Sequence, residues 1–170
     1  RGGDWGDNGL WRVLHTHDWN GQHSFIVNVF QLWNGNQLQA SQVLDSRSNP
    51  STTNIGDASF IRAYSMWVIL DNFGQVPYRD TELPSSSVPE VLTGQAALDF
   101  ILADIDMAIA NAPATPAGSG EANLRASKAA ARYLKAKVLL NKHIYLGTAP
   151  EASDMAEVIS LVDEITAEGY

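Results

Sequence analysis

The sequence of 170 residues contains no cysteine, so thiol catalysis, thiolate metal sites and disulfide bonds are all excluded. It also lacks any run of about 18 apolar residues, the length that a membrane-spanning helix requires. Basic residues are few: 11 Lys and Arg stand against 19 Asp and Glu, which gives a formal net charge of −8. A surface of this sign repels a phosphate backbone, so the composition argues against nucleic acid as a partner.

Motifs of the common enzyme classes are missing as well. The sequence has no phosphate-cradling glycine loop, no nucleophile elbow and no zinc-protease helix. Glycoside hydrolysis needs two carboxylates that face each other across a cleft, and no pair of acidic residues stands out here. We therefore expect a protein that is not an enzyme and that needs no cofactor or metal.

What is present is the composition of a globular protein, with 45% hydrophobic and 18% charged residues. The chain opens at Arg1 without a methionine and stops at Tyr170, just past an amphipathic pattern. We interpret it as an internal segment of a longer polypeptide. Any targeting signal or lipid anchor is then expected outside these residues.

Apolar residues recur at helical spacing in five segments. The predicted helices cover residues 22–45, 57–73, 94–112, 127–146 and 153–168. Asp57 and Ser127 are the expected N-caps of the second and fourth helices, and Gly74 and Gly147 are the expected stops. The composition of 46–56 predicts a loop.

The remaining patterns define the fold class. Residues 1–21 are rich in glycine, asparagine and tryptophan, which favours an irregular loop. We group the helices of a single segment, 1–170, into a first pair over 22–73, a second pair over 94–146, and a fifth helix over 153–168. No segment alternates with period two long enough to demand a strand. We predict an all-α fold of tetratricopeptide-like helical hairpins with long irregular loops.

The third helix has the clearest amphipathic pattern. Its apolar stripe includes Ile105, which we expect to be buried against the fourth helix. The opposite face carries Asp99 and Asp106, with Asp104 nearby. The second helix is apolar almost all round, so it should be largely buried.

Four local strings resemble one family. They are Arg1-Gly2-Gly3-Asp4-Trp5-Gly6-Asp7, then Phe60–Tyr64 leading into Leu70–Tyr78, then Ile101–Ala108, and Arg125–Arg132. In this order they resemble the SusD/RagB family of bacterial outer-membrane lipoproteins. The most specific string is "R-A-[YF]…F-G-x-V-P-Y", and "R-A-[ST]-K-x-A-A" is the second.

The resemblance implies a fold and a function. Members of this family are SusD-like helical proteins whose loops carry the ligand site. They sit at the cell surface, anchored in the outer membrane, beside a TonB-dependent (SusC-like) transporter. They hold oligosaccharides, or sometimes peptides, for uptake. We therefore expect non-catalytic capture of an oligosaccharide or another nutrient and its delivery to such a transporter.

Tryptophan can stack on the C–H face of a sugar ring while polar neighbours bond the hydroxyls. The candidate ligand-binding residues lie in the first twenty positions: Arg1, Asp4, Trp5, Asp7, Asn8, Trp11 and Trp19. The alternative for Trp5 is that it folds back over a helix end. Trp33 and Trp67 lie within apolar helical patterns and are predicted to be core residues.

Two alternative functions and one surface remain open. A generic helical-repeat scaffold would bind a protein partner. A metal-dependent hydrolase would use His15 and His17, although further metal ligands are scarce in the sequence. Lys128, Arg132 and Lys135 share one helix face. That face is either solvated and paired with carboxylates such as Asp99 or Asp106, or a docking surface for the transporter.

Overall fold

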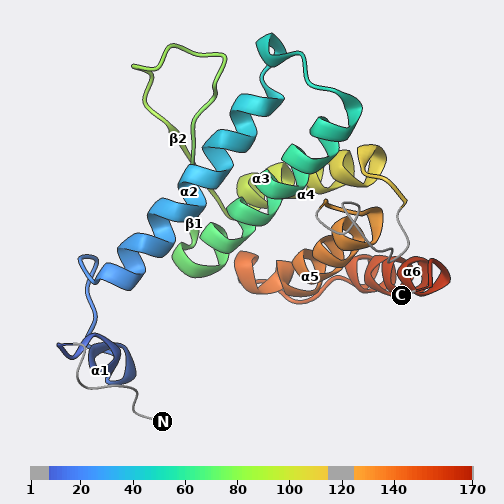
Figure 1. Cartoon of the computed structure of the whole chain (residues 1–170). Helices are drawn as coiled ribbons and strands as arrows, with labels where there is room; N and C mark the ends of the chain where they lie inside the picture. Colours follow the sequence, from blue (N-terminus) through green and yellow to red (C-terminus); the bar gives the residue numbers. More distant parts are fainter. Residues whose placement is uncertain (1–7, 115–124, 170) are drawn as a thin grey trace. The chain divides into compact units, whose positions relative to one another are not determined.

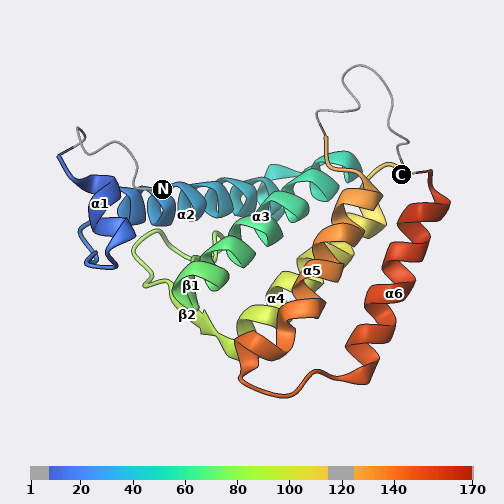
Figure 2. The same cartoon turned by 90° about the horizontal axis from the view of Figure 1, so that it is seen from below.

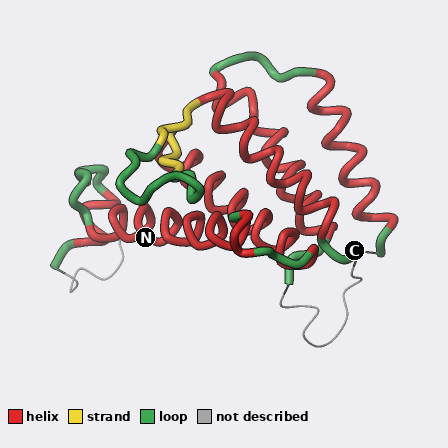
Figure 3. The backbone as a smooth tube through the Cα atoms, turned by 90° about the horizontal axis from the view of Figure 1, so that it is seen from above, coloured by secondary structure: helices red, strands yellow, loops and turns green. Residues whose placement is uncertain are grey.

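The structure is a computed structural model that describes residues 8–114 and 125–169. The chain divides into two compact units, residues 1–32 and 33–170, and each is described by itself. Helices dominate, and two short strands are the only other regular elements in the described ranges (Figure 3). The prediction of an all-α fold is confirmed.

The first unit holds α1, Leu10–His15, and the start of α2, Ser24–Leu44, both labelled in Figure 1. The second unit takes in the rest of α2 and seven further elements. In order they are the 3-10 helix η1 (Ser46–Ser48), α3 (Thr52–Phe73), β1 (Gln75–Tyr78), β2 (Glu90–Thr93), α4 (Gly94–Asn111), α5 (Lys128–Leu146) and α6 (Ala152–Ala167).

Two of the predicted irregular segments contain helix. Within 1–21, Leu10–His15 forms α1, although the flanking glycines and asparagines suggested only turns. Within 46–56, α3 begins at Thr52, and the side chain of Ser51 accepts a hydrogen bond from the Asn54 N–H at 3.2 Å. The expectation that Asp57 caps this helix is therefore wrong, because Ser51 provides the acceptor six residues earlier.

Gly56 lies in the second turn of α3 despite the low helix propensity of glycine, and a close backbone contact explains why. A Cβ at this position would lie 2.8 Å from the Ala112 backbone N and 2.9 Å from the Asn111 carbonyl carbon. Only a residue without a side chain allows the start of α3 to approach the end of α4 this closely. A tertiary contact thus outweighs the local preference for a loop.

The core of the second unit lies between α3, α4 and α5, which Figure 2 shows next to one another. The largest fully buried side chains on α3 and α4 include Met66, Ile69, Leu98, Ile101 and Ile105. Ile105 shares this core with Leu134 and Val138 of α5, and its side chain is fully buried, as predicted. α4 packs against both α3 and α5, so these helices form a continuous row.

A short antiparallel sheet follows α3. Gln75–Tyr78 pairs with Glu90–Thr93, and Val76 faces Leu92 in the core. No segment of the sequence demanded a strand, because two four-residue segments are too short for alternation to show. Gly74 ends α3, as predicted: it has φ 70° and adopts the left-handed conformation.

The fourth predicted helix has its expected ends. The Ser127 side chain accepts a hydrogen bond from Ala130 N–H at 3.1 Å, and Gly147 ends α5 at φ 63°. The chain then turns back, so that α6 lies alongside α5 (Figure 2).

The predicted basic face of α5 is paired with carboxylates, largely on α6. Arg132 bonds Glu164 and Glu168, and Lys135 lies 2.8 Å from Asp106 and 2.6 Å from Glu157. The interpretation as a paired face is therefore right for these two residues. Of the two expected partners, Lys135 finds Asp106, whereas Asp99 accepts a hydrogen bond from Gln95 within α4.

Candidate ligand-binding sites

Three of the candidate ligand-binding residues fall within the described ranges: Asn8, Trp11 and Trp19. Arg1, Asp4, Trp5 and Asp7 lie outside them, so their placement in a site stays a prediction. Trp11 and Trp19 are 50% and 45% exposed, which leaves ring surface open for stacking.

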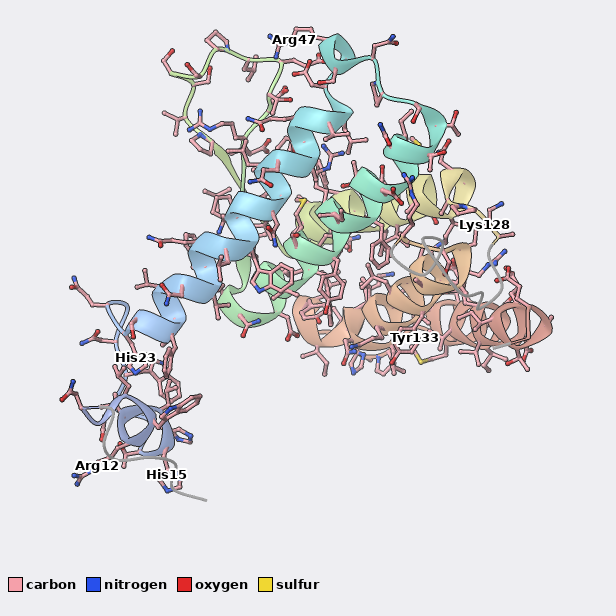
Figure 4. All side chains as sticks on the ribbon, viewed as in Figure 1. Arg12, His15, His23, Arg47, Lys128 and Tyr133 are labelled. Atoms are coloured by element: carbon pink, nitrogen blue, oxygen red, sulfur yellow. The ribbon has the colours of Figure 1, made fainter. Side chains whose placement is uncertain are left out.

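Local contacts hold both indoles in the first unit. The Trp11 ring packs against Phe25 at 4.8 Å, and the edge of Trp19 meets His17 at 5.1 Å. His23 is buried, and one ring nitrogen lies 3.1 Å from the Leu10 carbonyl oxygen. α1 and the start of α2 are thereby fastened together, and Figure 4 shows His23 between them. The partly exposed Trp11 and Trp19 side chains are thus held by contacts within the first unit.

The other two tryptophans belong to the core, as predicted. Trp67 is 9% exposed, and Trp33 packs against the same cluster. The Trp67 indole N–H donates to the Tyr145 hydroxyl at 2.9 Å, and that hydroxyl donates to Asp71 at 2.9 Å. Burial, with the neighbouring Asp71 carboxylate, raises the pKa of Tyr145 to about 12. The polar groups of Trp67 and Tyr145 therefore both have hydrogen-bond partners.

Arg62 and Asp104 form a pair that the sequence interpretation missed. The Arg62 guanidinium donates from Nε and Nη2 to the two Asp104 oxygens, both at 2.7 Å, and lies 5.0 Å from the centre of the Phe100 ring. Asp104 was placed near the polar face of its helix, yet its side chain is only 8% exposed. Burial raises the pKa of Asp104, although Arg62 pulls it in the opposite direction. Because a buried carboxylate without a partner is costly, we interpret this pair as structural.

A second candidate site lies in the second unit, beside the C-terminal half of α2. It is a cleft of about 710 Å³ between Leu38 and Gln42 of α2, the turn at Asp45–Ser48, and the segment Arg79–Ser85. Its lining is mostly charged, amide and hydroxyl side chains, with apolar surface from Leu38, Leu83 and Pro84. Of the three candidates that the structure describes, Asn8, Trp11 and Trp19, none lines this cleft.

Arg47, which Figure 4 labels, lines this cleft and is held in place by hydrogen bonds. Its Nε and Nη2 donate to Asp45 at 2.8 and 2.6 Å, and Nη2 also donates to the Thr81 carbonyl. The Asp45 side chain is only 5% exposed, and hydrogen bonds from the Arg47 side chain and backbone hold its pKa well below the usual range. Opposite, Arg79 donates to the Ser85 and Ser87 carbonyls, both at 2.8 Å.

The described residues give the hydrolase alternative no support. Within residues 8–114 and 125–169, no three His, Asp or Glu side chains are placed to hold a metal ion together. His15 and His17 belong to α1 and to the turn behind it. Over the same ranges, no helix combines the length and apolarity that crossing a membrane requires.

Known structures share this fold. A SusD-like protein from Bacteroides fragilis superposes with a TM-score of 0.70 at 22% identity, over 89% of this chain and 29% of that one. A structure solved with xylogluco-oligosaccharide superposes with a TM-score of 0.60 at 19% identity, over 98% of this chain and 30% of the other. The chain has a SusD-like helical fold and spans less than a third of either solved chain.

Sequence comparison adds no relative. No family model matches the chain, and no curated protein matches it. The likeness therefore rests on the fold, together with the four strings found in the sequence.

Proposed function

We propose that this chain is part of a SusD/RagB-type nutrient-binding lipoprotein of the outer membrane, which binds oligosaccharide without catalysis and passes it to a TonB-dependent transporter. The observation that carries the proposal is the SusD-like fold, shared over 89% of the chain. One structure of this fold was solved with a xylogluco-oligosaccharide. The half-exposed indoles of Trp11 and Trp19 add surfaces that suit a sugar ring.

The tryptophan-rich start of the chain is the first place to test. We expect Trp5 to stack on the ligand, with Arg1, Asp4, Asp7 and Asn8 bonding its hydroxyls. Stacking on one aromatic side chain is worth about 1–3 kcal/mol, by analogy with bases. Trp5→Ala should therefore weaken binding by about 5- to 150-fold.

Calorimetry with a xylogluco-oligosaccharide, next to thermal melts, provides the readout. Trp11→Ala and Trp19→Ala test the two indoles that the structure describes, and Trp67→Ala is the control. Because Trp67 is 9% exposed within the core, its loss should lower the melting temperature first. If Trp5→Ala, Trp11→Ala and Trp19→Ala all bind normally, the glycan site lies elsewhere.

A scaffold for a protein partner is the second candidate, because α5 keeps an apolar stripe exposed. Tyr133, Leu140 and Ile144 are 60%, 50% and 65% exposed and lie on one helix face. Ligand screening separates the two functions. A change in tryptophan fluorescence with oligosaccharide supports nutrient capture, whereas a response to peptides alone supports the scaffold.

A further inference from the structure

The cleft beside α2 is longer than its central hollow. A hollow of about 480 Å³ shares Gln42 and Ser48 with it and continues to Asn54. A smaller one of about 140 Å³ shares Leu38 and Arg79 and continues to Asn34. Between Asn34 and Gln42 alone the helix rises roughly 12 Å. The three hollows therefore form one elongated groove, longer than a single sugar ring.

The two sides of the groove are tied together before any ligand arrives. Arg47 joins the turn after α2 to the Thr81 carbonyl, and Thr81 Oγ1 lies 3.4 Å from the Ser41 carbonyl oxygen. At the far end, the Gln37 amide donates to the Pro77 carbonyl of β1. A groove with braced walls loses little conformational entropy on binding, which favours affinity.

Several polar groups along the groove keep unused hydrogen-bonding capacity. Arg47 Nη1, together with Nε and Nη2 of Arg79, has no partner among the described residues. The same holds, within the described ranges, for the side-chain amides of Gln39, Gln42 and Asn49, all of which are exposed. Amides both donate and accept, so they suit hydroxyl groups.

The charge of the lining favours a neutral ligand. Arg47 and Arg79 are balanced by Asp45 and Asp80, and the remaining polar lining is uncharged. Leu38, Leu83 and Pro84 supply apolar surface for C–H groups. Part of each guanidinium already bonds an acceptor of the protein, and the balance of charge in the lining gives a uronate no net attraction. The apolar surface is open and does not enclose a side chain, so it favours a peptide less than a sugar.

We propose that this groove is a binding site for an extended, neutral oligosaccharide, separate from the tryptophan-rich segment. Arg79 and Gln42 bond ring hydroxyls, and the leucine and proline side chains pack against ring carbons. The inference rests on the proposed function, because it names a second place at which the same class of ligand is held. Among the described residues no aromatic ring lines the groove, so hydrogen bonds carry most of its affinity.

The test follows the ¹H–¹⁵N spectrum of the whole chain while xylogluco-oligosaccharide is added. Gln42→Ala removes an open amide, and Asn36→Ala removes an exposed amide on the same helix outside the groove. We expect shifts at Gln42, Ser48 and Arg79, a three- to tenfold weaker affinity for Gln42→Ala, and less than a twofold change for Asn36→Ala. Binding should change little when sodium chloride is raised.

The possible outcomes separate the two claims. If the oligosaccharide shifts only the Trp11 and Trp19 indoles, and Gln42→Ala binds it like the unmodified chain, the groove is not a glycan site while the proposed function stands. If no residue shifts with any oligosaccharide, the proposed function itself fails. Stronger binding of tetragalacturonate, or of an alanine tetrapeptide, at the groove overturns the assignment of a neutral sugar.

Discussion

Removal of Arg62 tests whether the buried ion pair holds α3 to α4. The Arg62 and Asp104 side chains are 14% and 8% exposed, and two hydrogen bonds of 2.7 Å join them. Arg62→Met keeps most of the side-chain volume but leaves the Asp104 carboxylate buried without its partner. Loss of one member of such a pair costs about 3–5 kcal/mol. We expect the free energy of unfolding at pH 7 to fall by that amount.

The double variant Arg62→Met/Asp104→Leu separates the destabilisation caused by an unpaired buried carboxylate from the net contribution of the ion pair to the free energy of unfolding. Replacing both members with apolar residues is often neutral, so the double variant should recover most of the loss. Urea unfolding followed by circular dichroism measures both variants. A double variant as unstable as the single one would refute the reasoning, since the damage would then come from packing.

The same variant should respond to pH with a defined sign. Burial raises the pKa of Asp104 in the folded chain, and loss of Arg62 removes the group that opposes this rise. The folded single variant then binds a proton at a higher pH than the unfolded chain. Its stability therefore falls as pH rises through this range, and its deficit relative to the unmodified chain should shrink on acidification toward pH 4. A deficit that stays constant or grows toward pH 4 contradicts this account.

Three further changes test the core. Ile105→Ala should destabilise by about 2–4 kcal/mol in urea unfolding, because the side chain is fully buried; a loss below about 1 kcal/mol would mean that the site is loosely packed. Gly56→Ala should destabilise by about 1–3 kcal/mol in the same assay, because its Cβ meets the Ala112 backbone at 2.8 Å; a gain would show that helix propensity decides there. Tyr145→Phe should lose less stability than the unmodified chain between pH 10 and 12, because the unfolded tyrosine ionises first; parallel pH curves would refute the raised pKa.

The helices could be predicted because their signals are local. Apolar spacing located α4 and α5, Ser127 marked the start of α5, and Gly74 and Gly147 marked two ends. A cap needs only a side chain that reaches its own backbone, and a left-handed stop needs only a glycine. The burial of Trp67 followed from the same kind of pattern.

The candidate sites were less accessible to this reasoning. Composition singled out Trp11 and Trp19, which the structure leaves half exposed. It could not indicate the cleft beside α2, because Arg47 and Arg79 are separated by an entire helix and meet the same hollow only in the folded chain.

The sequence by itself determined the helical class, the positions of the five long helices and most of their ends, since these depend on periodicity and on caps within a few residues. Only the tertiary structure decided that Asp104 is buried on Arg62, that Gly56 belongs to a helix, and that β1 pairs with β2. Each of these depends on residues at least 12 positions apart in the chain. The free energy of such contacts comes from packing, desolvation and close backbone approach, which local preference does not encode.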